Sequence, residues 1–291
     1  MLPGLRLFAP AGRVQPVCDD QPVREHRQWN VRGVPATPLL VSLRVVRNEP
    51  AHSQQDVVLR AILRRCRAER SQTTPVVVFD LDGTLMDNRP RTVAILRELA
   101  GRYRDLDPEV ARRLEEARAH ELEYLLADSL ERLGAHRAEL VEEMQAFWRD
   151  RFFADSHLPH DVALPGAVEF VRACYDAGAI LVYLTGRDLP LMGAGTFASL
   201  RDLGFPIGVP ATELVLKPDA AMPDEAFKRL AAPDLARVGH VIAAFDNEPA
   251  NCNVMLAHYP DAHVVYVDTQ HTPGAPDLGA GVCVVRDFEM E

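Results

Sequence analysis

Two aspartates, Asp80 and Asp82, directly follow an apolar run and are separated by a single leucine. A carboxylate can attack phosphorus and form an acyl phosphate, which divides one difficult step into two easier ones. A second carboxylate two residues on can protonate the leaving oxygen and later deprotonate a water. Gly83 allows the backbone to turn sharply at this point. An Asp-x-Asp-Gly segment alone is also typical of an ordinary turn, so the chemistry needs support from other parts of the chain.

Further polar residues follow other strand-like apolar runs. In an open parallel sheet, ligands bind beyond the carboxyl ends of the strands, so residues at these positions are expected to meet at one edge. A hydroxyl and an ammonium there can hold phosphoryl oxygens, and carboxylates there can bind Mg²⁺. The residues are Thr185 and Gly186 after Ile180–Leu184, Lys217 after Leu214–Leu216, and Asp246 after Val241–Phe245.

Lysine is rare in this chain, which has 30 arginines but only Lys217 and Lys228. The lysine side chain ends in a compact ammonium, whereas the arginine side chain ends in a planar fork. A lysine directly after a strand-like run therefore favours a role for a compact positive charge at the expected site.

The elements that must position these residues alternate between apolar runs and helical stretches from residue 76 onward. Unbroken runs such as Val76–Phe79 and Val264–Val267 are typical of strands in a parallel sheet buried on both faces. The alternation predicts an α/β fold with a doubly wound parallel sheet, and a helix over 55–70 leads into it. Further helices are expected over 166–177, 196–203, 224–231 and 249–258.

Residues 89–155 break this alternation, because they have apolar stripes at helical spacing and no convincing strand. They predict a small helical domain inserted into the α/β core, with helices over 90–103, 108–133 and 136–153. Residues 1–52 are rich in proline, which predicts loop or disorder with one short strand over Leu39–Val46. The expected division is a partly disordered N-terminal extension over 1–70 that ends in a helix, a core over 71–88 and 156–291, and the helical domain over 89–155.

Four motifs together resemble the haloacid-dehalogenase-like superfamily. VVVFDLDGTLMDN is similar to its nucleophile motif, LTGR to its second motif, LKP to its lysine motif and FDNEP to its last, acidic motif. The resemblance covers about residues 71–270. It implies a Rossmann-like core, an obligatory Mg²⁺ and an aspartyl-phosphate intermediate.

The resemblance also implies a role for each matching residue. Asp80 becomes the nucleophile and a metal ligand, and Asp82 the general acid and base, which binds the metal through its backbone carbonyl. The remaining roles are phosphate binding by Thr185, Gly186 and Lys217, and metal binding by Asp246.

The acidic motif departs from the family pattern. Many members carry a second acidic residue next to the first or four to five residues on, where this chain has Asn247, Ala250 and Asn251. Glu248 lies two residues on. The candidates for the second metal contact are Asn247, Glu248 and Asn251, and we favour Asn247 or Glu248.

The helical insertion lies between the first two motifs, where members of the family carry a helical cap. A cap that closes over the site excludes water and obstructs a polymer, which favours a small phosphorylated metabolite over nucleic acid. Asp82 argues against a dehalogenase, and a cap without lysine argues against a phosphonate-cleaving enzyme. The alternatives are a polynucleotide 3′-phosphatase or nucleotidase, a sugar phosphomutase, and a non-catalytic scaffold.

Charge and cysteine content favour a cytoplasmic enzyme. The net charge is −10, and residues 71–291 contain 20 basic and 36 acidic residues, so this part is a poor partner for polyanions. Five cysteines without a C-x-x-C pair suit a reducing compartment. We expect no secretory signal and no membrane span, and the sequence indicates no particular oligomeric state.

Overall fold

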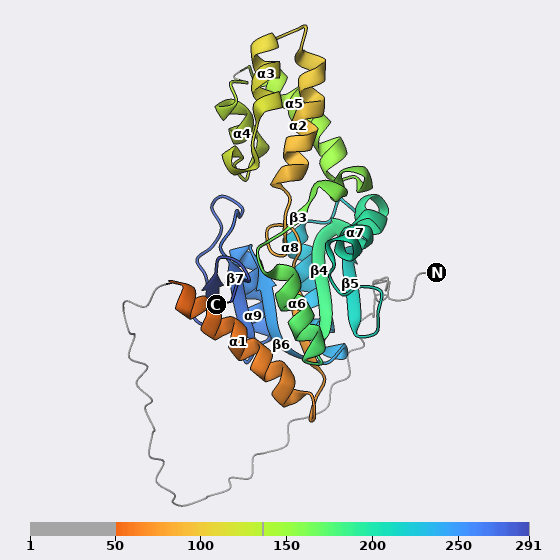
Figure 1. Ribbon diagram of the computed structural model, residues 1–291, viewed down its shortest axis with the longest axis vertical. Coiled ribbons are helices and arrows are strands. Elements are labelled where there is room, and N and C mark those ends of the chain that lie inside the picture. Colours follow the sequence, from red (N-terminus) through yellow and green to blue (C-terminus); the bar gives the residue numbers. More distant parts are fainter. Residues whose placement is uncertain (1–50, 136, 291) are drawn as a thin grey trace, which may run out of the picture.

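The core of the protein is a six-stranded parallel sheet in the order β5-β4-β1-β6-β7-β8 (Figure 1). The structure is a computed structural model, and it describes residues 51–135 and 137–290. The sheet and its flanking helices confirm the predicted Rossmann-like α/β fold. The strands are β1 (Pro75–Phe79), β4 (Ile180–Asp188), β5 (Thr212–Lys217), β6 (His240–Asp246), β7 (His263–Val267) and β8 (Cys283–Val285).

Helices cover both faces of the sheet, which explains why its strands are apolar without a break. Side chains alternate along β1, so Val77 and Phe79 belong to one apolar cluster and Val76 and Val78 to another. The first cluster includes residues of α1 (Ala51–Glu69), α6 (Ala167–Asp176) and α7 (Leu189–Leu203). The second includes residues of α8 (Asp224–Ala231), the 3₁₀ helix η3 (Ala232–Arg237) and α9 (Pro249–His258).

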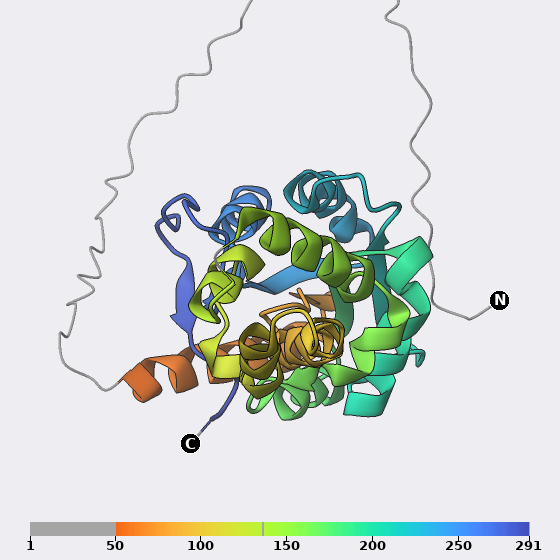
Figure 2. The same ribbon diagram turned by 90° about the horizontal axis from the view of Figure 1, so that it is seen from above.

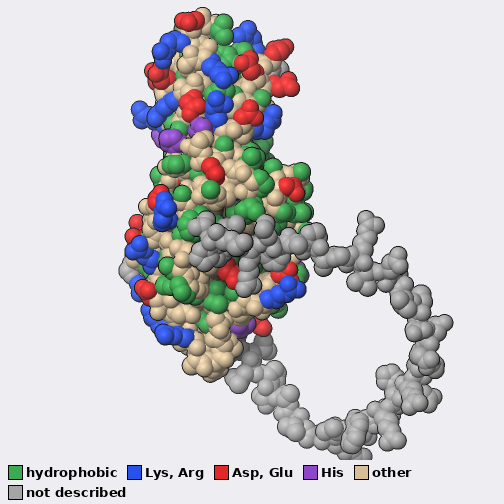
Figure 3. Space-filling view, turned by 90° about the vertical axis from the view of Figure 1, so that its right-hand side faces the viewer, with side chains coloured by type: hydrophobic (Ala, Val, Ile, Leu, Met, Phe, Trp, Pro, Cys, Tyr) green, Lys and Arg blue, Asp and Glu red, His purple; other side chains and the backbone are tan. Residues whose placement is uncertain are grey.

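A helical subdomain, residues 89–152, lies over one end of the sheet (Figures 1 and 2). It has its own apolar cluster, and charged side chains cover much of its outer surface in Figure 3. A short antiparallel pair, β2 (Met86–Asp87) with β3 (Val162–Ala163), and the 3₁₀ helix η2 (Asp155–His160) lie at its base. Its helices are α2 (Arg89–Tyr103), α3 (Pro108–Glu116), η1 (Ala119–Glu121), α4 (Leu126–Arg132) and α5 (Ala138–Phe152).

The single helix expected over 108–133 is broken into α3, η1 and α4. Ala117 and Leu122 both have extended backbones at the breaks. A continuous helix of this length would span about 39 Å at 1.5 Å per residue, well beyond the 15-residue helices α2 and α5 that it packs with. Folding back places Leu114, Leu122 and Leu130 in the same small apolar cluster.

Helix α1 joins the two ends of the described chain. The side chain of Gln55 donates to Asp287 Oδ1 at 2.6 Å and accepts from the backbone N of Arg286 at 3.0 Å. Nearby Phe288 is buried in the same apolar cluster as Ile62 of α1. The strand expected over Leu39–Val46 and most of the expected loop over 1–52 lie outside the described residues. No helix in the described part of the chain combines the length and apolar character that crossing a membrane requires.

The docking of α1 is testable, because the helix carries both a buried and an exposed aliphatic residue. Ile62 is 0% exposed and Val57 is 60% exposed. Ile62→Ala should lower the free energy of unfolding by about 2–5 kcal/mol, since it removes buried apolar atoms and leaves a cavity. Val57→Ala should change it by less than about 0.5 kcal/mol. Urea denaturation of both variants measures this, and equal effects would contradict the docking of α1.

Candidate active site

A cavity of about 1000 Å³ lies between the carboxyl edge of the sheet and the helical subdomain. The sheet side contributes Asp80 and Asp82 after β1, and Asn247 and Glu248 after β6. Thr185 and Gly186 line it from β4. Asp246 lies directly behind this surface, 5% exposed. The structure therefore brings together every residue predicted for the site except Lys217, which does not line the cavity.

Lys228, on α8, carries the positive charge at this edge. Its Nζ lies 2.6 Å from Asp80 Oδ1 and 2.7 Å from Asp246 Oδ2, and all three side chains are buried. Burial, assisted by the Asp246 charge, raises the pKa of Asp80 to about 7 even though the Lys228 ammonium opposes this shift. Burial acts to lower the pKa of Lys228, but the Asp246 and Asp80 carboxylates outweigh it and raise that pKa above its usual value.

Lys217, which the LKP motif suggested for this role, contacts a different carboxylate. Its Nζ lies 2.7 Å from Asp224 Oδ1. The reason is the strand order: Lys217 ends β5, which β4 separates from β1. Strands are about 4.8 Å apart, so the end of β5 lies roughly 10 Å from β1. The rarity of lysine pointed to Lys228 as well, because it is the only other lysine of the chain.

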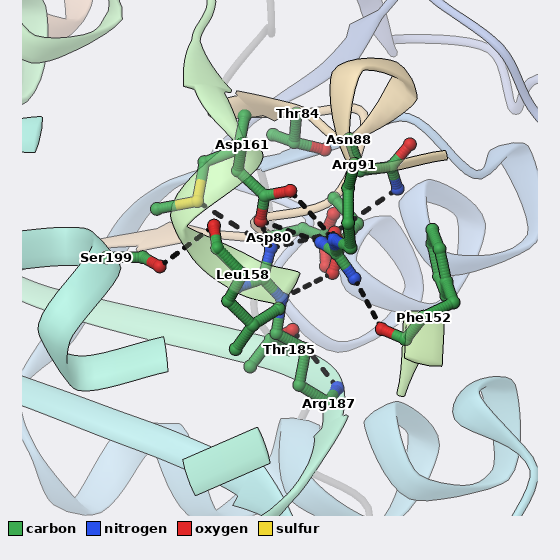
Figure 4. Close-up of polar contacts among 12 residues, drawn as sticks. Asp80, Thr84, Asn88, Arg91, Phe152, Leu158, Asp161, Thr185, Arg187 and Ser199 are labelled. Atoms are coloured by element: carbon green, nitrogen blue, oxygen red, sulfur yellow. Dashed lines mark hydrogen bonds and ion pairs between the residues drawn. The ribbon is translucent and has the colours of Figure 1, made fainter. Parts of the chain in front are cut away.

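Asp82 is held by two buried arginines, a feature that the sequence did not reveal. The two are Arg91 and Arg187, both labelled in Figure 4. Arg187 donates from Nε to Asp82 Oδ2 at 2.7 Å and from Nη2 to Asp82 Oδ1 at 2.8 Å. Arg91 Nη2 donates to the same Oδ1 at 2.9 Å. Burial favours the neutral acid, but Arg187 and Arg91 outweigh it and hold the pKa of Asp82 below its usual range. In this conformation Asp82 is therefore ionised.

The same arginines connect Asp82 to the base of the helical subdomain. Both bond to Asp161, which lies between η2 and β3 and is fully buried: Arg91 Nη2 and Arg187 Nη2 each lie 2.7 Å from its Oδ2. Arg91 belongs to α2, and its Nη1 donates to the carbonyl of Phe152 at the end of α5 at 2.9 Å. The first and last helices of the subdomain thus meet at a cluster that includes Asp82.

The polar side chains of the acidic motif contact different parts of the site. Asn251 Nδ2 donates to Asp246 Oδ1 at 3.1 Å. Asn247 instead accepts from Thr84 Oγ1 at 3.2 Å and donates to the carbonyl of Gln270 at 2.7 Å. Of the three candidates, only Asn251 places its side chain against Asp246. The start of α9 turns the position five residues on toward Asp246, and the favoured metal contact of Asn247 or Glu248 stays a prediction.

The Glu248 carboxylate joins the core to the helical subdomain. It accepts hydrogen bonds from Tyr124 Oη at 3.0 Å and from the backbone N of Thr272 at 3.0 Å. Beside it, Gln270 Nε2 donates to the carbonyl of Leu122 at 2.5 Å. Burial, with the nearby Glu248 charge, raises the pKa of Tyr124 to about 12. The loop after β7 and residues 122–125 thereby close one side of the cavity.

The residues at this edge suit a hard divalent cation. Asp80 and Asp246 together carry more negative charge than the Lys228 ammonium offsets, and their oxygens are ligands that Mg²⁺ prefers. The described residues contain no group of three or more His, Cys, Asp or Glu side chains arranged for a metal. A cation here would therefore also need backbone, amide or water oxygens.

Comparison with known proteins gives a match to one family over part of the chain. The family model of haloacid dehalogenase-like hydrolases matches residues 77–194, the part that contains Asp80, Asp82 and Thr185. The matched segment, 118 residues, is less than half of the 291-residue chain. A comparison with curated proteins gives no match.

The solved structures that resemble the chain share little sequence with it. Protein tyrosine kinase A of Mycobacterium tuberculosis is 18% identical, with a TM-score of 0.48 over 73% of this chain and 94% of that one. A predicted phosphatase from Clostridium acetobutylicum is 16% identical, with a TM-score of 0.44 over 73% and 93% of the two chains. A hydrolase of the same family from Entamoeba histolytica is 14% identical, with a TM-score of 0.41 over 74% and 94%.

The two lysines should differ sharply in their effect on stability. Lys228→Met leaves two buried carboxylates without a cation, so it should lower the free energy of unfolding by about 3–5 kcal/mol in metal-free buffer. Lys217→Met is the matched control. Its partner Asp224 is 62% exposed, so the loss should be at most about 1 kcal/mol. Urea denaturation with EDTA present measures both free energies of unfolding. A larger loss in Lys217→Met than in Lys228→Met would indicate that Lys217 is the lysine of the site.

Proposed function

We propose that the protein is a Mg²⁺-dependent phosphomonoester hydrolase that acts on a small phosphorylated metabolite through an aspartyl-phosphate intermediate. The observation that carries this proposal is the buried carboxylate of Asp80, which lines the cavity and is bound to the buried ammonium of Lys228. A carboxylate nucleophile beside a fixed positive charge suits attack on an anionic phosphoryl group.

The residues divide the reaction into two displacements. An Asp80 oxygen attacks phosphorus, the ester P–O bond breaks, and the leaving oxygen takes a proton from Asp82. Asp82 then takes a proton from a water that attacks the phosphorus, and the bond to Asp80 breaks to release phosphate. Thr185 and Lys228 hold the phosphoryl oxygens. When bound, Mg²⁺ would be held by Asp80 and Asp246 and would supply charge stabilisation to the phosphoryl group.

Asp82 needs a proton before it can donate one. In the structure Arg187 and Arg91 keep it ionised, so the proposal requires that substrate binding weakens at least one of these contacts. The substrate phosphate brings competing negative charge to the same pocket, which favours such a rearrangement.

We also propose that the helical subdomain acts as the cap of this site. The contacts of Tyr124 and Leu122 with the core support it, because they close the cavity over the catalytic edge. A closed cavity favours a small substrate over a polynucleotide. A cytoplasmic location belongs to the same proposal and is supported by the buried free thiols of Cys66, Cys174 and Cys252.

Replacing the nucleophile tests the covalent mechanism. Asp80→Asn should reduce kcat for p-nitrophenyl phosphate with Mg²⁺ to below a few per cent of wild type, because an amide neither attacks phosphorus nor binds the metal as a carboxylate does. Asp268→Asn changes an exposed carboxylate of the same cavity and should keep kcat within two-fold. Substantial turnover by Asp80→Asn, with a circular dichroism spectrum like that of wild type, would refute the mechanism.

Magnesium titration tests the assignment of the acidic motif. Asp246→Ala should abolish activation by Mg²⁺. Asn251→Ala should raise the Mg²⁺ concentration for half-maximal activity about ten-fold, because Asn251 orients the Asp246 carboxylate. Glu248→Gln should leave that concentration within two-fold, since its contacts are with Tyr124 and Thr272. A stronger effect of Glu248→Gln than of Asn251→Ala would place the second metal contact at Glu248.

A further inference from the structure

The cap side of the cavity is formed largely by one face of α5. Gln145, Trp148, Arg149 and Phe152 all line the cavity, and their spacing of three, four and seven residues places them on one helical face. Phe153, at the end of the same helix, lines the cavity as well. This wall faces the end of the sheet that carries Asp80.

Aromatic rings make up the centre of this wall. The rings of Trp148 and Phe152 stack with centroids 4.2 Å apart, and Phe153 meets both edge-on at 6.0 and 5.1 Å. Arg91 lies 4.3 Å from the Phe152 centroid, so this ring is already packed between a cation and an indole. Phe153 has the greatest exposure, at 44%. An exposed aromatic ring beside a stacked pair offers a surface for a further ring.

The polar groups of this wall are few. Arg149 is exposed, lines the cavity and makes no ion pair with any other described residue, whereas Arg89 is bound to Asp87 and Glu123 to Arg132. Arg149 and Gln145 can therefore supply donors to a ligand, whereas hydroxyls that face the rings of Trp148 and Phe153 would find no partner on those surfaces.

We propose that the substrate is a phosphomonoester whose organic part is a planar aromatic ring with hydrogen-bonding substituents. This inference rests on the proposed function, which fixes the phosphoryl end at Asp80. The organic part then lies in the remainder of the cavity, where Trp148 and Phe153 provide ring surfaces and Arg149 and Gln145 provide donors. A nucleoside monophosphate, pyridoxal 5′-phosphate and phosphotyrosine all share this chemistry.

A substrate panel tests the inference on the full chain with Mg²⁺. We expect kcat/KM for at least one of AMP, UMP, pyridoxal 5′-phosphate and phosphotyrosine to exceed that for glucose 6-phosphate and glycerol 3-phosphate by about ten-fold or more. The aromatic compound with the highest kcat/KM then identifies whether the natural ring is a nucleobase, a pyridine or a phenol. Equal or better turnover of the two non-aromatic compounds would overturn the inference and leave the proposed phosphatase activity intact.

Variants of Phe153 separate stacking from simple apolar contact. Phe153→Ala and Phe153→Leu should both lower the ratio of kcat/KM for the best ring compound to that for glycerol 3-phosphate, by about five-fold or more, mainly through KM. Leu106→Ala, an exposed residue of the subdomain that does not line the cavity, is the control and should keep the ratio. Wild-type selectivity in Phe153→Leu would overturn ring stacking.

Binding to Asp80→Asn gives a readout that does not depend on turnover. Calorimetry should show the best-bound ring phosphate of the panel held about ten-fold more tightly than glycerol 3-phosphate, and Phe153→Leu in the same background should remove most of the difference. If no phosphomonoester is turned over by the wild type but this binding preference is found, the proposed function fails and the ring site stands. Equal binding of both classes would overturn the ring site.

Discussion

The charge balance at the ends of β1 and β6 is the constraint on which the rest of this structure depends. The two strands are parallel neighbours, and their register pairs Phe79 with Phe245, so Asp80 and Asp246 follow side by side. Two carboxylates buried this close to each other are costly unless a cation is held between them. Helix α8 meets that requirement: it packs Phe227 against the sheet and directs Lys228 to both carboxylates. The position of α8 is therefore as important to the site as the strands themselves.

Much of the fold and part of the site could be predicted from sequence. Apolar runs identify strands well when both faces of a sheet are buried. The position of a strand in the sheet also fixes where the residues directly after it lie. Asp80, Thr185 and Asp246 are of this kind. Lys228 is different, because its role depends on how a helix packs across the sheet, and no local pattern encodes that.

The arginine cluster could not be predicted for a related reason. Arg91 and Asp161 are 70 residues apart and meet only because the helical subdomain returns to its starting point. In a chain with 30 arginines, neither residue is conspicuous. The cluster nevertheless connects the subdomain directly to Asp82. A rotation of α2 against the core would move Arg91, one of the two arginines that bind Asp82. The position of the subdomain and the contacts of Asp82 are thus linked.

The position of β1 has a consequence for how the chain folds. It is the first strand of the six-stranded sheet, yet it lies between β4 and β6, so Val76 pairs with Ile180 on one side and Val241 on the other. Such distant pairings are slow to form, because the entropy of closing a long loop is lost before the new contacts stabilise the structure. During synthesis, β1 emerges with both edges unpaired. The partner of Val76 in β4, Ile180, follows 104 residues later, and its partner in β6, Val241, follows 165 residues later. The apolar cluster of the helical subdomain is formed by residues between 93 and 152, so it can form during this interval. The core of the insertion can thus form before the sheet that carries it, whereas α1 can make its contacts with Asp287 and Phe288 only after these residues have been synthesised.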